Sequence, residues 1–303
     1  MRYYDGVHSL IGNTPLVRLN NLGLPSGVEL FAKLELWNPG GSVKDRIGLS
    51  MLRDAEESGK LKPGGAIVEA TAGNTGLGIA IAALGKGYRV IFTVPTKFSA
   101  EKLSLMRALG AEIVSTPRED GMLGARKKAD ELLREIPGAV SLEQFENPAN
   151  PRAHYDGTGP EIYRDLDGRI DYFVAGAGSG GTYSGALRYL KERVPGVRGV
   201  LADPVGSIMG GGEHADYDIE GIGNDFIPTT MDMSLVDDVI KVKDTDAFRA
   251  CAQLAGAEGI FAGISSGAAL HASLVLAGRV ASGNIVVVLP DRGDRYFSKD
   301  LYK

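Results

Sequence analysis

The chain has 303 residues, and 33 basic against 38 acidic side chains give it a formal net charge of −5. This length suffices for one large or two smaller domains, and a composition of 44% hydrophobic and 23% charged residues is typical of globular proteins. The mild acidity argues against nucleic-acid and membrane-surface partners, which select a basic face. No apolar run approaches the ~18 residues of a membrane-spanning helix. The single cysteine, Cys251, excludes an internal disulfide and is compatible with a cytoplasmic location.

Short β-branched runs alternate with helical patterns from residue 66 onward. The expected strands are Ala66–Ala70, Arg89–Val94, Glu112–Ser115, Asp171–Ala175, Gly199–Ala202 and Ile285–Leu289. Helical patterns lie at 43–58, 76–86, 100–109, 121–135, 182–194, 245–257 and 266–280. Because several strands are apolar throughout, helices are expected on both faces of the sheet. The alternation predicts a doubly wound, parallel α/β architecture, with Gln144–Pro151 as a crossing between two lobes.

The first motif in chain order is Asn38–Arg46, with the sequence NPGGSVKDR. Ser42 is suited to cap a helix, with Asp45 three residues later. Lys44 then lies in the first helical turn, where the helix dipole disfavours a cation. Its amine should therefore lose its proton more easily, as a Schiff-base lysine requires. The alternative is an ordinary solvated lysine, which is the commoner arrangement.

A second loop, Thr71–Gly76 (TAGNTG), also stands between an expected strand and an expected helix. Thr71, Asn74 and Thr75 can offer hydrogen-bond donors to a carboxylate at the helix N-terminus. The alternative is ordinary capping of the helix by one of these side chains.

A third loop, Gly176–Thr182 (GAGSGGT), contains the pattern G-x-G-x-x-G after a strand. Asp203 lies 22 residues past Gly181, which makes a dinucleotide site one interpretation. A phosphate cup for a smaller cofactor is a second, because glycines let backbone N–H groups converge on an anion. A plain tight turn is the third, and the loop alone does not separate them.

The fourth loop, Gly263–Ala268 (GISSGA), precedes an apolar helix. Ser265 or Ser266 either caps this helix or donates a hydrogen bond to a ring nitrogen of a ligand. No metal is expected, since metal-ligand spacing is lacking among Cys251 and the four histidines, His8, His154, His214 and His271.

In this order, the four loops resemble those of the cysteine synthase and cystathionine β-synthase family, which are pyridoxal-phosphate (PLP) enzymes of fold type II (tryptophan synthase β-like). The resemblance extends nearly end to end and includes GNTPLVRL, QFENPANP, GIGNDFIP and LPD. It implies a larger lobe, residues 1–40 and 146–303, that holds the PLP phosphate. It also implies a smaller mobile lobe, residues 41–145, with the substrate-carboxylate loop. The dinucleotide interpretation then falls away, and Asp203 becomes a strand-end or loop residue.

The resemblance also implies residue roles. Lys44 would form the Schiff base with PLP and act as the catalytic base. The other implied PLP ligands are Asn74 at the phenolic oxygen, Ser265 at the pyridine nitrogen, and Gly178, Ser179, Gly180, Gly181 and Thr182 at the phosphate. The implied substrate-binding residues are Thr71, Ala72, Gly73, Thr75 and Gln144 for the first substrate, and Gly221, Gly223 and Asn224 for the second.

The implied activity is β-replacement on O-acetyl-L-serine through an aminoacrylate. Sulfide, which gives cysteine, is the preferred nucleophile, and homocysteine, which gives cystathionine, is the alternative. Two departures bear on this choice. Ala72 replaces the serine of the usual T-S-G-N-T-G loop, as in similar bacterial enzymes that make cystathionine from O-acetylserine. The segment Ile219–Pro228 resembles cystathionine β-synthases, although Asn224 stands where those often carry tyrosine.

The resemblance further implies a homodimer and possible binding of the C-terminal peptide of serine acetyltransferase. A protein of a different class, a catalytically silent PLP-fold partner, is the remaining alternative. The retention of Lys44 argues against such a silent role.

Overall fold

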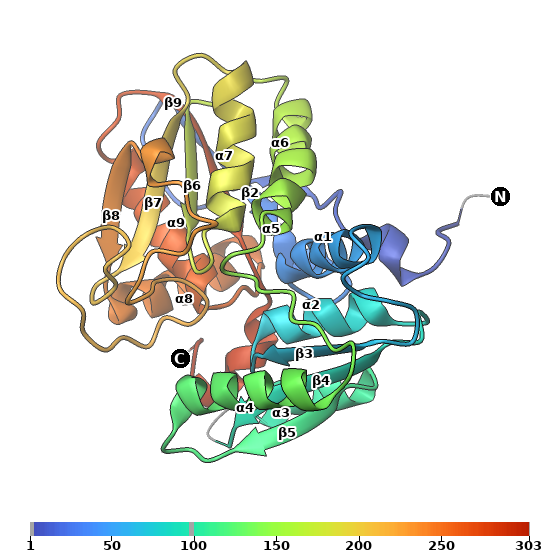
Figure 1. The fold of residues 1–303 in the computed structure, drawn as a ribbon. Coiled ribbons are helices and arrows are strands. Elements are labelled where there is room, and N and C mark those ends of the chain that lie inside the picture. Colours follow the sequence, from blue (N-terminus) through green and yellow to red (C-terminus); the bar gives the residue numbers. More distant parts are fainter. Residues whose placement is uncertain (1–2, 97–99, 303) are drawn as a thin grey trace. The chain divides into compact units, whose positions relative to one another are not determined.

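The computed structural model describes residues 3–96 and 100–302 (Figure 1). Contacts divide the chain into two compact units, which are described separately below. Unit 1 comprises Met1–Ile11 and Lys44–Ala149, and unit 2 comprises Gly12–Val43 and Asn150–Lys303. Among the described residues, no helix combines the length and the apolar character needed to cross a membrane.

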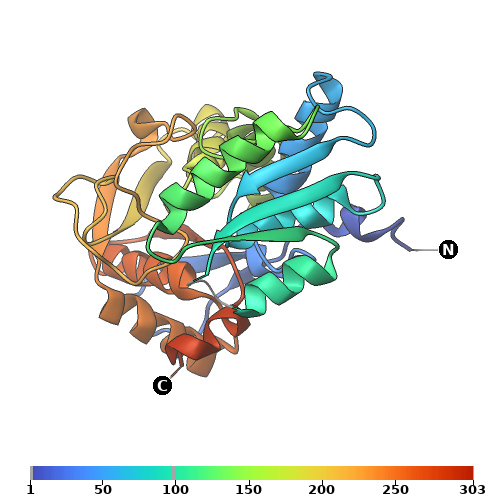
Figure 2. The same ribbon diagram turned by 60° about the horizontal axis from the view of Figure 1, so that its bottom comes forward.

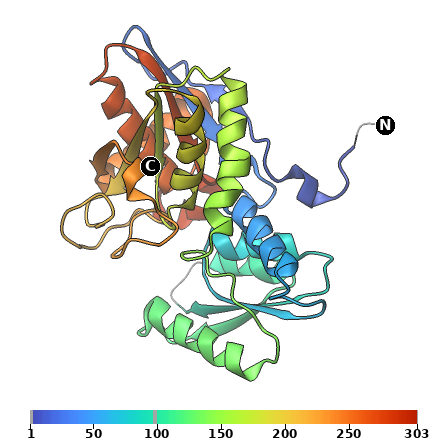
Figure 3. The same ribbon diagram turned by 45° about the horizontal axis from the view of Figure 1, so that its top comes forward.

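Unit 2 is built on a six-stranded sheet with the order β1-β2-β9-β6-β7-β8 (Figures 1 and 3). All neighbouring strands are parallel except β1, which pairs antiparallel with β2. The strands are β1 (Leu16–Arg18), β2 (Val28–Leu34), β6 (Tyr172–Gly176), β7 (Arg198–Pro204), β8 (Asp238–Val242) and β9 (Gly283–Leu289). The α-helices are α6 (Gly159–Asp165), α7 (Gly181–Arg193), α8 (Asp244–Glu258) and α9 (Ile264–Ala277), while α5 (Ala149–Ala153) begins where the two units divide. Shorter turns are η2 (Glu35–Trp37), the π-helical η3 (His154–Thr158), η4 (Met233–Leu235) and η5 (Gly293–Lys299).

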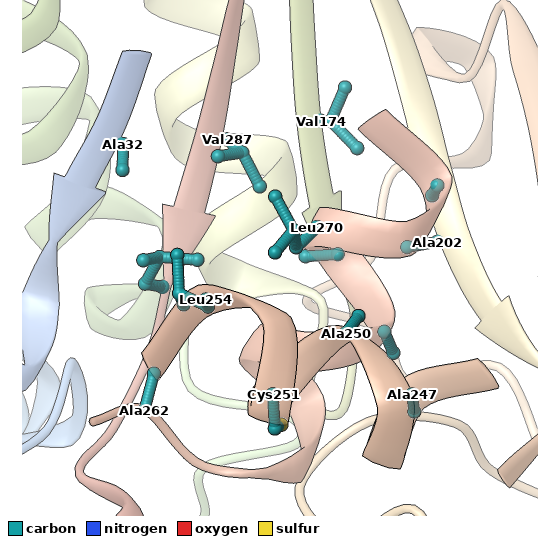
Figure 4. Packing of buried hydrophobic residues seen from close by; sticks show 14 of the residues in the cluster. Ala32, Val174, Ala202, Ala247, Ala250, Cys251, Leu254, Ala262, Leu270 and Val287 are labelled. Carbon is teal, nitrogen blue, oxygen red and sulfur yellow. The ribbon is translucent and has the colours of Figure 1, made fainter. Parts of the chain in front are cut away.

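Helices cover both faces of this sheet, as the wholly apolar strands predict. Along β9, Val286 and Val288 belong to the cluster that contains the buried side chains of α7. Val287 and Leu289 belong to the cluster on α8 and α9, which includes Cys251 (Figure 4). Successive residues of a strand point to opposite faces, so each strand contributes to both clusters. The expected doubly wound α/β architecture is confirmed.

Strand β2 was not expected from the sequence, because charged residues interrupt its apolar pattern. Lys33 is fully buried there, 2.8 Å from Glu161 Oε2, and its amine donates to the carbonyl of Thr14 at 2.7 Å. Glu161 also accepts a hydrogen bond from the amide of Asn13. A buried charge is tolerated when it is paired and hydrogen-bonded. The partners that make Lys33 acceptable inside the sheet come from distant parts of the chain.

Unit 1 contains a parallel three-stranded sheet with the order β3-β4-β5 and helix α4 across the strands (Figure 2). Its elements are η1 (Val7–Leu10), α1 (Lys44–Glu57), β3 (Ala66–Ala70), α2 (Asn74–Ala83), β4 (Arg89–Pro95), α3 (Ala100–Ala108), β5 (Glu112–Thr116) and α4 (Gly121–Glu135). The first eleven residues belong here, although the sequence places 1–40 in the larger lobe. One contact of this segment with unit 1 is made by the His8 ring, whose Nε2 lies 2.7 Å from the carbonyl oxygen of Ile81.

Helices α1 and α2 pack backbone against backbone. A methyl group at Gly48 would overlap the carbonyl of Gly78, and one at Gly78 would overlap the carbonyl of Lys44. Only glycine permits so close an approach of two helices. The first turn of α1, which carries Lys44, therefore lies directly against α2, whose N-terminus follows the loop Thr71–Gly73.

Candidate active site

The loop between β6 and α7 has the backbone of an anion cradle. Gly180 adopts a left-handed conformation, with φ of 83°, and α7 begins at Gly181. A methyl group at Gly180 would overlap Met231, and one at Gly181 would overlap the side chain of Asn150. Within the described residues, none of the five N–H groups of Gly178–Thr182 donates to an acceptor. Such a row of unused N–H groups at a helix N-terminus suits an anion such as phosphate.

Polar side chains hold this loop from several sides of unit 2. Asn224 Nδ2 donates to the carbonyl of Gly178 at 2.6 Å, and Asn150 Nδ2 donates to Ser179 Oγ at 2.9 Å. The Thr230 hydroxyl donates to the carbonyl of Ser179. These contacts involve carbonyl and hydroxyl groups of the loop, and its N–H groups stay without an acceptor among the residues that the structure describes.

The hydroxyl of Thr182 is held separately, by a buried histidine. Nε2 of His154 lies 3.1 Å from Thr182 Oγ1, and its Nδ1 lies 2.8 Å from Thr158 Oγ1. His154 is fully buried in the π-helical turn. The histidine therefore orients the side chain of the last residue of the glycine loop.

The loop Thr71–Gly76, which the sequence predicts to bind a carboxylate, belongs to unit 1. Helix α2 begins at Asn74, and its capping residue, Gly73, offers no side-chain hydrogen bond. Thr75 Oγ1 instead donates to Gln144 Oε1 at 2.7 Å, across 69 residues of sequence. Thr71 and Thr75 are buried. The structure thus brings together Thr75 and Gln144, and side-chain capping does not account for this loop.

Glu69, a residue that sequence reasoning missed, holds the segment that leads to Gln144. Its carboxylate accepts hydrogen bonds from Ser141 Oγ at 2.7 Å, from the N–H of Leu142 at 3.1 Å and from the N–H of Glu143 at 3.2 Å. Burial raises the pKa of Glu69, and the three hydrogen bonds oppose that rise. The only sequence signal was an acidic residue within an otherwise apolar strand.

Lys44 is the first residue of α1, two residues after Ser42, so it lies in the first helical turn as expected. Its backbone carbonyl packs against Gly78 of α2. Lys44 and the loop Thr71–Gly76 therefore belong to the same unit and keep a defined spacing.

Of the two interpretations of the GISSGA loop, the structure excludes the one in which a serine caps the helix. Helix α9 begins at Ile264 with Gly263 as its cap, so neither Ser265 nor Ser266 caps it. Both serines are buried, and neither hydroxyl has a hydrogen-bond partner within the described part of the chain. A methyl group at Gly221 would lie 3.7 Å from Ser265 Oγ, which places the Gly221 segment beside this serine.

Asp203 is a strand residue with structural partners. It lies in β7, is 1% exposed, and its Oδ2 accepts from Lys241 Nζ at 2.6 Å and from the N–H of Gly210 at 2.9 Å. Oδ2 is thus engaged by two donors, and the residue is buried, so the carboxylate is not exposed to a dinucleotide ribose. This geometry supports a phosphate cup over a dinucleotide site.

These features fit PLP, the cofactor that the sequence resemblance implies. The row of N–H groups suits its phosphate. The hydroxyl of the buried Ser265, which has no hydrogen-bond partner among residues 3–96 and 100–302, suits its ring nitrogen. Lys44 supplies a primary amine of the kind that a carbonyl cofactor needs.

Comparison with known proteins agrees with this fit. The family model for pyridoxal-phosphate dependent enzymes matches residues 7–291. The chain is 52% identical to the O-acetylserine dependent cystathionine β-synthase of Bacillus subtilis, over 100% of this chain and 99% of that protein. It is 46% identical to a cysteine synthase of Staphylococcus aureus, over 98% and 97% respectively. A crystal structure of the O-acetylserine dependent cystathionine β-synthase from Helicobacter pylori superposes with a TM-score of 0.94 at 42% identity, covering 100% of both chains. The chain therefore belongs to the fold-type II family of pyridoxal-phosphate dependent enzymes, and pyridoxal phosphate is its cofactor.

Proposed function

We propose that this protein catalyses β-replacement on O-acetyl-L-serine, in which acetate leaves the β-carbon and a thiol takes its place. The observation that carries the proposal is the placement of Lys44, Thr75 and Gln144 in one unit, where a lysine lies near a loop suited to a carboxylate. The names of the relatives in Bacillus subtilis and Helicobacter pylori support O-acetylserine as the first substrate.

The proposed cofactor ligands are the residues that the sequence resemblance assigns to pyridoxal phosphate. Gly178, Ser179, Gly180, Gly181 and Thr182 hold the phosphate, Asn74 bonds the phenolic oxygen, and Lys44 makes the covalent link. When bound, pyridoxal phosphate supplies the electron sink that weakens bonds at the substrate α-carbon. Once the substrate amine has displaced Lys44 from its link to the cofactor, Lys44 Nζ would be free to take the proton from that carbon.

Ser265 would set the strength of this electron sink. Its hydroxyl would share a hydrogen bond with the ring nitrogen without keeping that nitrogen protonated, whereas a carboxylate would keep it protonated. A weaker sink suits β-elimination, because the electrons pass directly to the leaving group. Ser265 is a buried residue, and its hydroxyl makes no hydrogen bond to the described residues, in agreement with this role.

The substrate α-carboxylate is proposed to bind at the start of α2. The hydroxyls of Thr71 and Thr75 and the amide of Gln144 are its side-chain donors, while Ala72 and Gly73 shape the loop. The N-terminus of the ten-residue helix adds a favourable dipole for the negative charge.

For the second substrate, we propose homocysteine as the better nucleophile and retain sulfide as the competing candidate. Homocysteine carries charged amino and carboxylate groups that need polar partners in a closed site. The segment with Gly221, Gly223 and Asn224 lies against the glycine loop, where the N–H of Gly223 donates to the carbonyl of Ala177 at 2.8 Å. The absence of a hydroxyl at Ala72 and the named relatives in Bacillus subtilis and Helicobacter pylori also favour homocysteine. The cysteine synthase of Staphylococcus aureus favours sulfide.

The test is to measure acetate release and amino-acid product from O-acetylserine with each thiol, using the purified enzyme loaded with pyridoxal phosphate. We expect a higher kcat/KM for homocysteine than for sulfide and no product from Lys44→Ala. A kcat/KM for sulfide tenfold above that for homocysteine would make cysteine synthesis the better assignment. No acetate release with either thiol would refute β-replacement.

Two further properties that the resemblance implies stay predictions. A homodimer can be tested by light scattering, and binding of a serine acetyltransferase peptide can be tested by peptide titration.

A further inference from the structure

The segment that follows Val140 runs beside β3 but has only a short stretch of backbone pairing with it. The N–H of Val68 donates to the carbonyl of Val140, and the N–H of Val140 donates to the carbonyl of Ala66, both at 2.9 Å. Beyond this point the segment forms no regular ladder with the strand. The N–H groups of Leu142 and Glu143, which follow Ser141, therefore need other acceptors.

Where this backbone pairing ends, the carboxylate of Glu69 accepts the hydrogen bonds of the segment. Its two oxygens accept the N–H groups of Leu142 and Glu143 and the hydroxyl of Ser141. The side chain is buried, at 6% exposure. Three donors for one buried carboxylate are a charge-assisted arrangement, stronger than bonds to a neutral acceptor. Glu69 therefore determines the path of the chain up to the residue before Gln144.

Gln144 in turn meets the substrate loop, where its Oε1 accepts the hydroxyl of Thr75 at 2.7 Å. Glu69 lies two residues before Thr71, at the opposite end of the same loop. One carboxylate thus connects both ends of the pocket proposed for the substrate α-carboxylate. All these residues belong to unit 1.

We propose that Glu69 is a positioning residue for this pocket, which acts through Gln144 and so enforces the requirement for a free α-carboxylate on the substrate. The inference rests on the proposed function, in which Thr75 and Gln144 bind that carboxylate. Glu69 is buried, and its carboxylate accepts hydrogen bonds from Ser141, Leu142 and Glu143.

The test is Glu69→Gln in the holoenzyme. The substitution preserves size but replaces one acceptor oxygen with an NH₂ group, which faces N–H donors. The probes are L-serine and L-serinamide, which differ in the free carboxylate, and the readout is their binding measured by calorimetry. We expect L-serine to bind about tenfold or more weakly, from the loss of a bond to a charged group, and L-serinamide to change less than about twofold, since it does not use the carboxylate donors.

Glu143→Gln is the matched control. Glu143 belongs to the same segment, is exposed, and pairs with Lys60 at 3.2 Å. Its loss should leave both affinities unchanged. Ser141→Ala is a milder second variant that removes one of the three donors, and we expect a smaller loss in the same direction. It keeps the inference testable if Glu69→Gln does not fold.

A double-mutant cycle with Gln144→Ala distinguishes the positioning role of Glu69 from the assignment of the carboxylate pocket itself. If Glu69 acts through Gln144, Glu69→Gln adds little to the loss of L-serine binding already caused by Gln144→Ala. Full additivity, or equal losses for L-serine and L-serinamide, would overturn the positioning role while the carboxylate pocket stands. If Gln144→Ala and Thr75→Ala bind both probes as the wild type does, the pocket itself is wrongly assigned, and the role of Glu69 falls with it.

Discussion

Replacing Gly180 with alanine should damage the cofactor loop far more than the same change at a matched glycine outside it. Gly180 has φ of 83°, and Gly196 has a nearly equal φ of 87°. Alanine in this conformation costs about 1–2 kcal/mol at either position. The two sites differ in their surroundings, since nothing lies within 4 Å of a methyl group at Gly196, whereas a methyl group at Gly180 would lie 2.7 Å from Met231 Cα.

The overlap with Met231 adds a further cost of about 1–3 kcal/mol, the usual range for overpacking. We therefore expect Gly180→Ala to lower the free energy of unfolding by about 2–5 kcal/mol and Gly196→Ala by about 1–2 kcal/mol. Both are measured by urea unfolding of the cofactor-free proteins, because a bound ligand adds its own stabilisation.

The same pair of variants tests whether the N–H groups of the glycine loop bind the cofactor. Relief of the overlap moves the backbone of Gly180 and so disturbs the row of N–H groups. Gly180→Ala should therefore lose pyridoxal phosphate during dialysis, while Gly196→Ala retains it. Equal unfolding free energies within about 0.5 kcal/mol, together with equal cofactor affinities, would refute the steric reasoning.

Three further predictions concern Lys44, Ala72 and Cys251. Lys44→Ala should abolish β-replacement and leave the far-ultraviolet circular dichroism unchanged; near-wild-type turnover would contradict the assignment of this lysine. Ala72→Ser restores a hydroxyl to the substrate loop and should raise the ratio of kcat/KM for sulfide to that for homocysteine, and an unchanged ratio would show that this position does not discriminate. Burial raises the pKa of Cys251 to about 12, so at pH 8 the thiol stays protonated and only about one molecule in 10⁴ carries the reactive thiolate. A thiol reagent should therefore label the native protein very slowly, faster as the pH rises toward this pKa, and one equivalent per chain after denaturation; rapid labelling at pH 8 would refute the burial.

Local sequence signals determined the parts of the fold that depend on local physics. The apolar run at residues 285–289 marked β9 because both faces of that strand are covered by helices. Ser42 and Asp45, interpreted as a capping pair, placed Lys44 in a first helical turn, and α1 does begin at Lys44. The glycine loop at 176–182 was recognised because positive φ and close backbone approach demand glycine. These features are encoded within a few residues.

The tertiary structure alone decided which distant groups meet. A lysine such as Lys33 is not expected in a buried strand, and its ion pair with Glu161, more than a hundred residues away, is what makes it acceptable there. The sequence around residue 69 does not indicate that the carboxylate of Glu69 accepts hydrogen bonds from the N–H groups of Leu142 and Glu143. These two residues are far from β3 along the chain, because β4, β5 and α4 lie in between. Such contacts depend on how the elements pack, and a hydrogen bond between residues far apart in the chain leaves no periodic trace in the sequence of either partner.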